Sequence, residues 1–224
     1  RVRVFELGRV FLRDASVRNT DTTVEGFHQP MRVAGVAYGA NDMLQWGRKE
    51  QGIDFFDVKG DVEALLAPRR ATFVAAEHPA LHPGRSARVE LDGQPIGWVG
   101  ELHPRWVREL GFPSAPVLFE LDIAALTVEY PVFAEVSRFP QVRRDLAVVL
   151  AEDATFSSVL EGVTSSASSL LRHVFVFDVY RGSGIETGRK SIALGLIFQD
   201  KNSTLTEEVV EGDMGSELLF DGMA

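Results

Sequence analysis

The sequence lacks cysteine altogether and has no long uncharged apolar run. Without thiols the chain forms no disulfide, no thiolate zinc site and no cysteine nucleophile, which fits a cytoplasmic protein. Charged residues or prolines interrupt every candidate membrane segment, so we expect no membrane span. Positive charge is scarce, because 23 Lys and Arg stand against 32 Asp and Glu and leave a net charge of −9. That balance argues against indiscriminate binding to DNA or RNA, which needs a broad positive field.

The composition supports a folded chain with more than one domain. Hydrophobic residues make up 45% of the 224 residues, which is enough for a core, and the length suits two domains. The first residues alternate like a strand, without an initiator methionine or a signal peptide, so we expect a piece of a longer chain. From residue 131 onward, 8 Lys and Arg are outnumbered by 14 Asp and Glu, so any nucleic-acid contact there requires a local basic patch.

The first 130 residues show mainly strand periodicity. Alternation predicts strands at 2–12, 31–38, 71–76, 85–91, 96–102 and 117–123, and apolar spacing predicts helices at 54–66 and 104–110. The Asp92-Gly93 pair between two alternating runs is a strong signal for a β-hairpin. This pattern is typical of an antiparallel α+β module. A proline-bounded linker at 130–140 follows, and we place the domain boundary between residues 130 and 131.

The second half predicts a strand at 144–150, a helix at 156–171 capped by Thr155, two strands at 174–180 and 190–198, and a helix from 204. The order β-α-β-β-α becomes a ferredoxin-like βαββαβ fold if one more strand is added. After Glu211 two glycines and a serine are expected to interrupt the last helix, at Gly212, Gly215 and Ser216. The final strand is therefore possibly missing, although residues 217–220 could add a short edge segment.

The predicted strands of the second half carry two different sets of side chains. The apolar set is expected to pack on the helices: Leu146, Val148, Phe175, Phe177, Val179, Ile192, Leu194, Leu196 and Phe198. The other set is small or polar: Asp145, Ala147, Asp178, Tyr180, Ser191, Ala193 and Gly195. Such a face can accept a nucleobase, and flanking cations can reach phosphates: Arg138, Arg143, Arg144, Arg181, Arg189 and Lys190. The alternative is an ordinary solvent-exposed face with incidental arginines.

Nine segments of the chain are similar, in the same order, to segments of bacterial phenylalanyl-tRNA synthetase β subunits. They are FELGRVF (5–11), DFFDVKGDVEALL (54–66), HPGRSA (82–87), GWVGELHP (97–104), FELDIAAL (119–126), RFPQVRRDLAVV (138–149), FDVYRG (177–182), GRKSIAL (188–194) and TLTEEVV (204–210). The resemblance covers nearly the whole chain up to about Glu211.

This resemblance implies an α2β2 enzyme that charges tRNA(Phe) with phenylalanine and uses ATP and magnesium, with the aminoacylation site in the α subunit. For this chain it implies a catalytically inactive, class II synthetase-like module over residues 1–130. A ferredoxin-fold anticodon-binding domain over residues 131–224 would follow. The residues expected to bind tRNA are Arg138, Arg143, Arg144, Asp178, Tyr180, Arg189 and Lys190.

No catalytic or metal site is expected in this chain. A class II site needs two arginines that clamp ATP, but residues 5–8 lack the first, and residues 117–126 offer Glu120 and Asp122 in place of the second. His78, His82 and His103 lack metal-ligand spacing on a helix. The glycines at 182–188 lead into a strand, whereas a phosphate loop leads into a helix.

The first module is expected to act as an interface to the α subunit and the rest of the β subunit. Candidate contact residues are Phe55, Phe56, Trp98 and Trp106, although any of them can equally belong to the core. A different function also fits: the acidic second domain docks a protein partner without touching RNA. An independent enzyme is disfavoured, because the catalytic constellation is missing.

Overall fold

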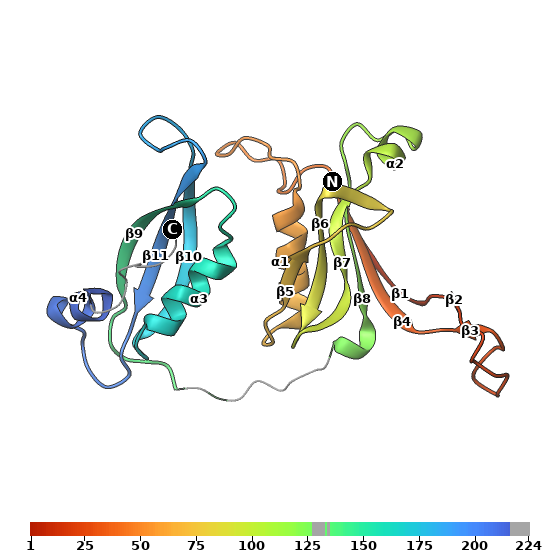
Figure 1. Cartoon of the computed structure of the whole chain (residues 1–224), viewed down its shortest axis with the longest axis horizontal. Helices are drawn as coiled ribbons and strands as arrows, with labels where there is room; N and C mark the ends of the chain where they lie inside the picture. Colours follow the sequence, from red (N-terminus) through yellow and green to blue (C-terminus); the bar gives the residue numbers. More distant parts are fainter. Residues whose placement is uncertain (127–132, 134, 216–224) are drawn as a thin grey trace. The chain divides into compact units, whose positions relative to one another are not determined.

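The computed structural model describes residues 1–126, 133 and 135–215, and the chain divides into two compact units, Arg1–Pro131 and Val132–Ala224 (Figure 1). The expected boundary between residues 130 and 131 lies outside the described residues. Within the described residues, no helix is long and apolar enough to cross a membrane.

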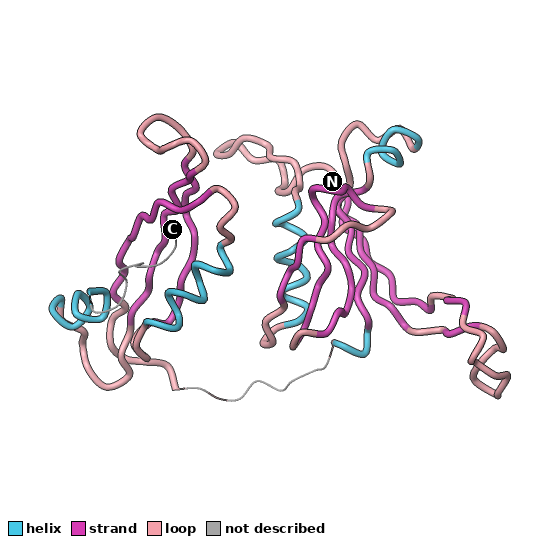
Figure 2. Tube along the Cα trace, viewed as in Figure 1, coloured by secondary structure: helices cyan, strands magenta, loops and turns pink. Residues whose placement is uncertain are grey.

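The first unit is built on a six-stranded antiparallel sheet with the order β1-β4-β8-β7-β6-β5. Figure 2 draws its strands in magenta. Its strands are β1 (Val2–Arg9), β4 (Met31–Tyr38), β5 (Thr72–Ala75), β6 (Leu81–Leu91), β7 (Gln94–Leu102) and β8 (Val117–Asp122). A small hairpin of β2 (Leu12–Arg13) and β3 (Phe27–His28) extends from β1 and β4, and the short helices are α2 (Pro104–Glu109) and η1 (Ile123–Ala125). The predicted hairpin at Asp92-Gly93 is confirmed: both residues have positive φ, 52° and 74°, as its tight turn requires.

Helix α1 (Phe55–Leu66) covers one face of this sheet, and its N-terminus is closed by a capping box between Asp54 and Asp57. Its apolar positions Val58, Val62 and Leu66 are buried at helical spacing. They pack on alternate residues of the strands, which complete the core: Val33, Ala37, Ala87, Val89, Leu91, Ile96, Val99, Val117 and Leu121.

The second unit has a three-stranded antiparallel sheet with the order β10-β11-β9. Its elements are β9 (Val142–Ala151), α3 (Phe156–Ser166), β10 (Leu171–Tyr180), β11 (Arg189–Phe198) and α4 (Glu207–Gly215). Both helices place residues in one core with the sheet: Val159 and Val163 from α3, and Val210 from α4. The helices therefore cover the same sheet face, as in a ferredoxin-like fold. Thr155 caps α3 by accepting a bond from the Ser158 amide at 3.2 Å, so that prediction is confirmed.

The expected interruption of the last helix is wrong at Gly212, because α4 continues through it. A helical glycine costs only about 1 kcal/mol relative to alanine, and fully buried Val210 anchors this helix on the core. Ser216 and the expected edge segment at 217–220 lie outside the described residues.

The predicted faces of β10 need correction, because this strand has register irregularities between Leu171 and His173 and between Val176 and Asp178. Val174 and Val176 pack in the core, so Phe175 lies on the opposite face, and Phe177 falls in the second irregularity, where it is 50% exposed. The expectation that Phe175 and Phe177 pack on the helices is thus wrong. An extra residue in one strand reverses the alternation beyond it.

Val179 lies on the helix side as predicted, in register with Ile192. It does not pack in the core, however, since 42% of the residue is exposed.

Candidate nucleic-acid interface

One face of the second unit's sheet lies opposite α3 and α4, and its positions on β9 are exposed: Arg143, Asp145, Ala147 and Val149. We call it the open face. By register its members are Arg143, Asp145, Ala147 and Val149 of β9, His173, Phe175, Asp178 and Tyr180 of β10, and Ser191, Ala193, Gly195 and Ile197 of β11. Phe177 belongs to it through its contacts with Phe175 and Arg143. The predicted grouping of Asp178 and Tyr180 with the small residues of β9 and β11 is confirmed by these pairings, since Asp178 is opposite Ala193 and Tyr180 is opposite Ser191.

Three aromatic rings follow one another along the open face of β10. His173 and Phe175 stack with centroids 5.8 Å apart and planes at 21°, and Phe175 and Phe177 are 6.3 Å apart. The ring of Phe175 lies directly on Gly195, where an added Cβ would come within 2.3 Å of the ring. The absence of a side chain at position 195 therefore lets this ring lie flat on the sheet.

Arg143 lies above this aromatic row. Its guanidinium carbon is 5.1 Å from the Phe175 centroid and 5.3 Å from the Phe177 centroid, within the range of a cation–π contact. Its Nε and Nη2 donate to the Asp145 carboxylate at 2.7 and 3.3 Å. The row thus carries a positive group that is already paired with an acid.

Tyr180 stands at the other end of the open face. Its hydroxyl donates to the Ser183 carbonyl at 3.2 Å, and a Cβ on Gly182 would come within 2.7 Å of that hydroxyl. The turn after β10 therefore holds the ring in place while leaving 45% of the residue exposed. Arg189 lies at the same end, in register with Ala151, and pairs loosely with Glu186 at 3.8 Å.

The expectation that Arg144 and Lys190 flank this face is wrong. Arg144 lies on the same face of β9 as the core residues, opposite Leu196 of β11. Its Nη2 donates to Glu207 of α4 at 3.1 Å. Lys190 is opposite buried Leu150, and its Nζ donates to the Glu152 carbonyl at 2.7 Å. Both side chains are on the helix side because they lie one residue away from the open-face positions Arg143 and Arg189.

Two further predicted cations lie off the sheet face. Arg138 precedes β9 and is exposed. Arg181 follows β10 and donates from Nε to Glu152 at 2.8 Å.

The aromatic row was missed by the sequence analysis, and one signal could have found it. The run from Val174 to Val179 is apolar at nearly every position, so alternation alone assigns no face. Gly195 in the middle of a buried strand was the available signal, since a glycine there often marks a close approach by another group.

The acidic residues of this unit lie mostly away from the open face. Glu161 is on α3, the residues Glu207, Glu208 and Glu211 are on α4, and Glu152 and Asp153 are in the turn after β9. The open face itself carries Asp145 and Asp178 beside Arg143 and Arg189. Its local charge is thus balanced although the unit is acidic.

In the first unit, the sheet face away from α1 has an arrangement that does not fit a bound triphosphate. Arg32 and Arg88 lie on that face, and both are paired: Arg32 with Glu120 at 3.8 Å and Asp122 at 3.6 Å, and Arg88 with Glu90 at 2.6 Å. Arg3 and Arg9 of β1 lie on the same face of the strand as Leu7, which is opposite the core residue Val33. They are therefore on the helix side. Carboxylates beside an already paired arginine repel phosphate.

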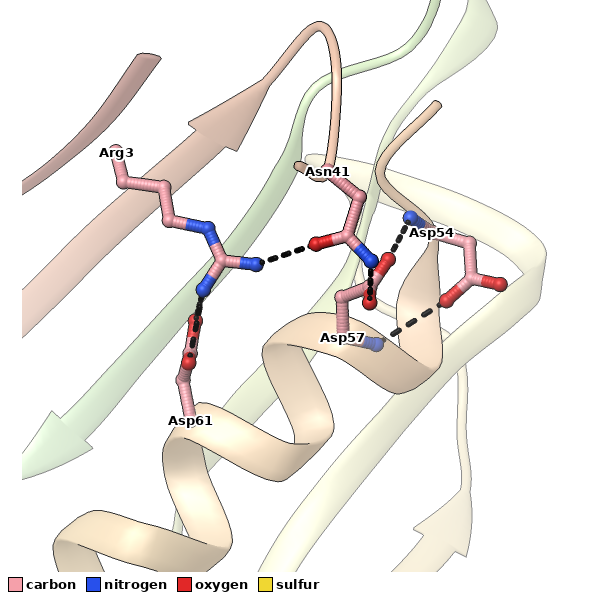
Figure 3. A network of polar contacts seen from close by, with 5 residues as sticks. All are labelled: Arg3, Asn41, Asp54, Asp57 and Asp61. Atoms are coloured by element: carbon pink, nitrogen blue, oxygen red, sulfur yellow. Dashed lines mark hydrogen bonds and ion pairs between the residues drawn. The ribbon is translucent and has the colours of Figure 1, made fainter. Parts of the chain in front are cut away.

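Arg3 belongs to a polar network at the start of α1 (Figure 3). Its Nη1 donates to both Asp61 oxygens at 3.0 and 2.9 Å, and its Nη2 donates to Asn41 Oδ1 at 3.1 Å. Asn41 in turn donates to Asp57 at 2.6 Å, and Asp57 accepts from the Asp54 amide at 2.8 Å. The network joins β1, the end of β4 and the capping box of α1, which is a structural role.

The histidines also have structural roles. The Nδ1 atoms of His78, His82 and His103 accept bonds from the backbone amides two residues later, at 3.3, 3.0 and 3.1 Å. Within the described part of the chain, no group of three His, Asp or Glu residues is placed to hold a metal.

Of the residues expected to form an interface, only Phe56 is largely exposed, at 72%. Phe55 packs on the core, Trp98 contacts His78 with ring planes tilted at 48°, and Trp106 is partly buried beside Arg105. Other exposed apolar residues of this unit lie on the edge strand β1, around the β2–β3 hairpin, in the loop before α1, late in α1 and after α2: Val2, Val4, Phe5, Leu7, Phe11, Leu12, Val24, Phe27, Met43, Leu44, Trp46, Leu65, Leu110 and Phe112.

Comparison with known proteins matches both units. Residues 1–123 match the family described as phenylalanyl tRNA synthetase beta chain CLM domain, and residues 137–216 match the ferredoxin-fold anticodon binding domain. Phenylalanine–tRNA ligase beta subunits from Burkholderia lata and Ralstonia nicotianae are each 47% identical over 100% and 94% of this chain. The protein of that name from Dechloromonas aromatica is 45% identical over 96% of it. The chain covers 27–29% of these relatives, so it spans less than a third of their length.

Proposed function

The chain belongs to the family of phenylalanine–tRNA ligase β subunits, and we propose that it binds the anticodon region of tRNA(Phe) and helps to assemble the ligase. The observation that carries this proposal is the open face, where aromatic rings stand on a floor of small residues between exposed cations. Unpaired bases of an RNA loop stack on such rings, and phosphates pair with arginine.

Within this proposal the residues have separate roles. Tyr180 offers a stacking plane, and Asp178 accepts hydrogen bonds from base amino or imino groups but repels phosphate. Arg189 and Arg138 are the proposed phosphate contacts. Arg144 and Lys190 contribute only if RNA draws them out of their bonds to Glu207 and the Glu152 carbonyl.

The net charge of −6 beyond residue 130 favours a second candidate function, in which this unit docks a protein without contacting RNA. Two features support the RNA-binding proposal over it. The acids are concentrated on the helix side and the turns, and the open face combines ring planes with small residues instead of a closed apolar patch. The two functions differ in what they predict for tRNA affinity.

The first unit is proposed as a non-catalytic scaffold. It would pack through its exposed apolar residues on the α subunit of an α2β2 ligase and on the rest of the β subunit. ATP and magnesium would act in the α subunit, since the pairing of Arg32 with Glu120 and Asp122 does not fit a triphosphate here. The complete ligase would work in the cytoplasm, where tRNA is charged.

The test compares Tyr180→Ala and Arg189→Ala in the assembled ligase, with tRNA(Phe) affinity measured across a salt series. Loss of Tyr180 should weaken binding about 5- to 100-fold with little change in salt dependence, because stacking is worth about 1–3 kcal/mol per base. Loss of Arg189 should lower the salt slope by about 0.7, the share of one phosphate on a single strand. Unchanged affinity at every salt concentration would favour the protein-docking function.

A further inference from the structure

Arg143 is held on the open face by three neighbours at once. Its guanidinium lies over two rings, Phe175 and Phe177, and binds Asp145 through two nitrogens. The Phe175 ring beneath it rests on Gly195. The group is thus supported from below and fixed from the side, although its side chain remains 50% exposed.

This arrangement differs from that of an arginine available to a phosphate. Two of the guanidinium nitrogens are already used by a carboxylate, and Asp145 compensates the positive charge. In contrast, Arg189 has only a loose ion pair at 3.8 Å with Glu186, in the turn before β11. An incoming phosphate would have to compete with Asp145 for Arg143 and would be repelled by it.

The exposed side of a guanidinium is a flat surface on which a nucleobase can stack. A plane that is fixed before binding loses less conformational entropy when the base arrives. Phe177 and Phe175 lie about 10 Å and about 16 Å along β10 from Tyr180, at about 3.3 Å per residue. A base on Arg143 would therefore be a different one from the base on Tyr180.

We propose that Arg143 is a preorganised stacking platform for a second unpaired nucleobase and makes no phosphate contact. The proposal rests on the proposed function of the open face as an RNA-binding surface. Arg143 would then bind RNA through the flat surface of its guanidinium and not through its charge.

The experiment replaces Arg143 by lysine and by alanine in the assembled ligase and measures affinity for a tRNA(Phe) transcript across a salt series. Lysine keeps the charge but lacks the plane, so both variants should lose affinity by about 5- to 100-fold with an unchanged salt slope. Arg189→Lys and Arg189→Ala are the matched pair, in which lysine should preserve affinity and alanine should flatten the slope by about 0.7. Thermal unfolding of each variant checks that the fold is retained.

If Arg143→Lys keeps the affinity of the parent protein and Arg143→Ala has a flatter salt slope, Arg143 is a phosphate contact and the platform is refuted. Normal affinity in both variants, while Tyr180→Ala binds weakly, would overturn the platform and leave the RNA-binding face intact. Normal affinity in every variant, Tyr180→Ala included, would refute the proposed function together with this inference.

Discussion

At the scale of single residues, glycines decide which aromatic side chains can lie on the sheets. Gly195 accommodates the ring of Phe175, and Gly35 accommodates Phe119 in the first unit, where an added Cβ would also come within 2.3 Å of the ring. Sequence alternation predicted that Gly195 lies on the open face. It could not predict that Phe175 lies across it, because the register irregularities of β10 arise from pairing with β11 and leave no local signal.

We predict that Gly195→Ala destabilises the second unit by about 1–3 kcal/mol, because the new methyl group forces the Phe175 ring off the sheet. The control is Gly212→Ala in α4, where nothing lies within 4 Å of the new Cβ. That change should stabilise the helix by up to about 1 kcal/mol. Hydrogen exchange of β10 and β11 peptides measures the first change, and α4 peptides measure the second. Equal protection of β10 in Gly195→Ala and the parent protein would contradict this account.

At the scale of elements, local signals predicted the turn at 92–93 and the start of α3, but α3 ends at Ser166 and not at residue 171 as predicted. The Asp92-Gly93 hairpin and the Thr155 cap depend on neighbouring residues, so the sequence was sufficient for both. The side of the sheet taken by Arg144 also follows from alternation, because Arg144 is two residues from Leu146, but its ion-pair partner was not predictable in the same way. Asp145 and Glu207 are both candidate partners of Arg144 in the sequence, and only the docking of α4 brings Glu207 within 3.1 Å of Arg144.

The network of Figure 3 leads to a prediction for β1. Arg3→Ala removes the bonds to Asp61 and Asn41, so the edge strand should open more easily, by about 1 kcal/mol, since these groups are partly exposed. Arg9→Ala is the control, because Arg9 donates to the Gln29 carbonyl at 3.1 Å and to no described carboxylate. Amide exchange in β1 should rise more in Arg3→Ala than in Arg9→Ala. The same rate in both variants would show that the network does not hold the strand.

At the scale of the whole molecule, each unit separates its structural face from the surface proposed for function. In the first unit α1 covers one sheet face, and exposed apolar residues lie outside the core on β1, around the β2–β3 hairpin and in the loop before α1, among other places. In the second unit α3 and α4 cover one face, and the aromatic row lies on the other. The α+β class, the ferredoxin-like order and the small and polar residues of the open face were predictable from periodicity, whereas the aromatic row on that face required the strand register.

The central claim is that the open face of the second unit meets the anticodon region of tRNA(Phe). The most direct measurement places a photo-crosslinking phenylalanine analogue at Tyr180 in the assembled ligase and maps the crosslinked nucleotide. The control position is Val209 on α4, which is 47% exposed on the helix side. We expect crosslinks from position 180 to fall in the anticodon loop and none from position 209. Crosslinks from position 180 elsewhere on the tRNA, or equal crosslinking from both positions, would contradict the account.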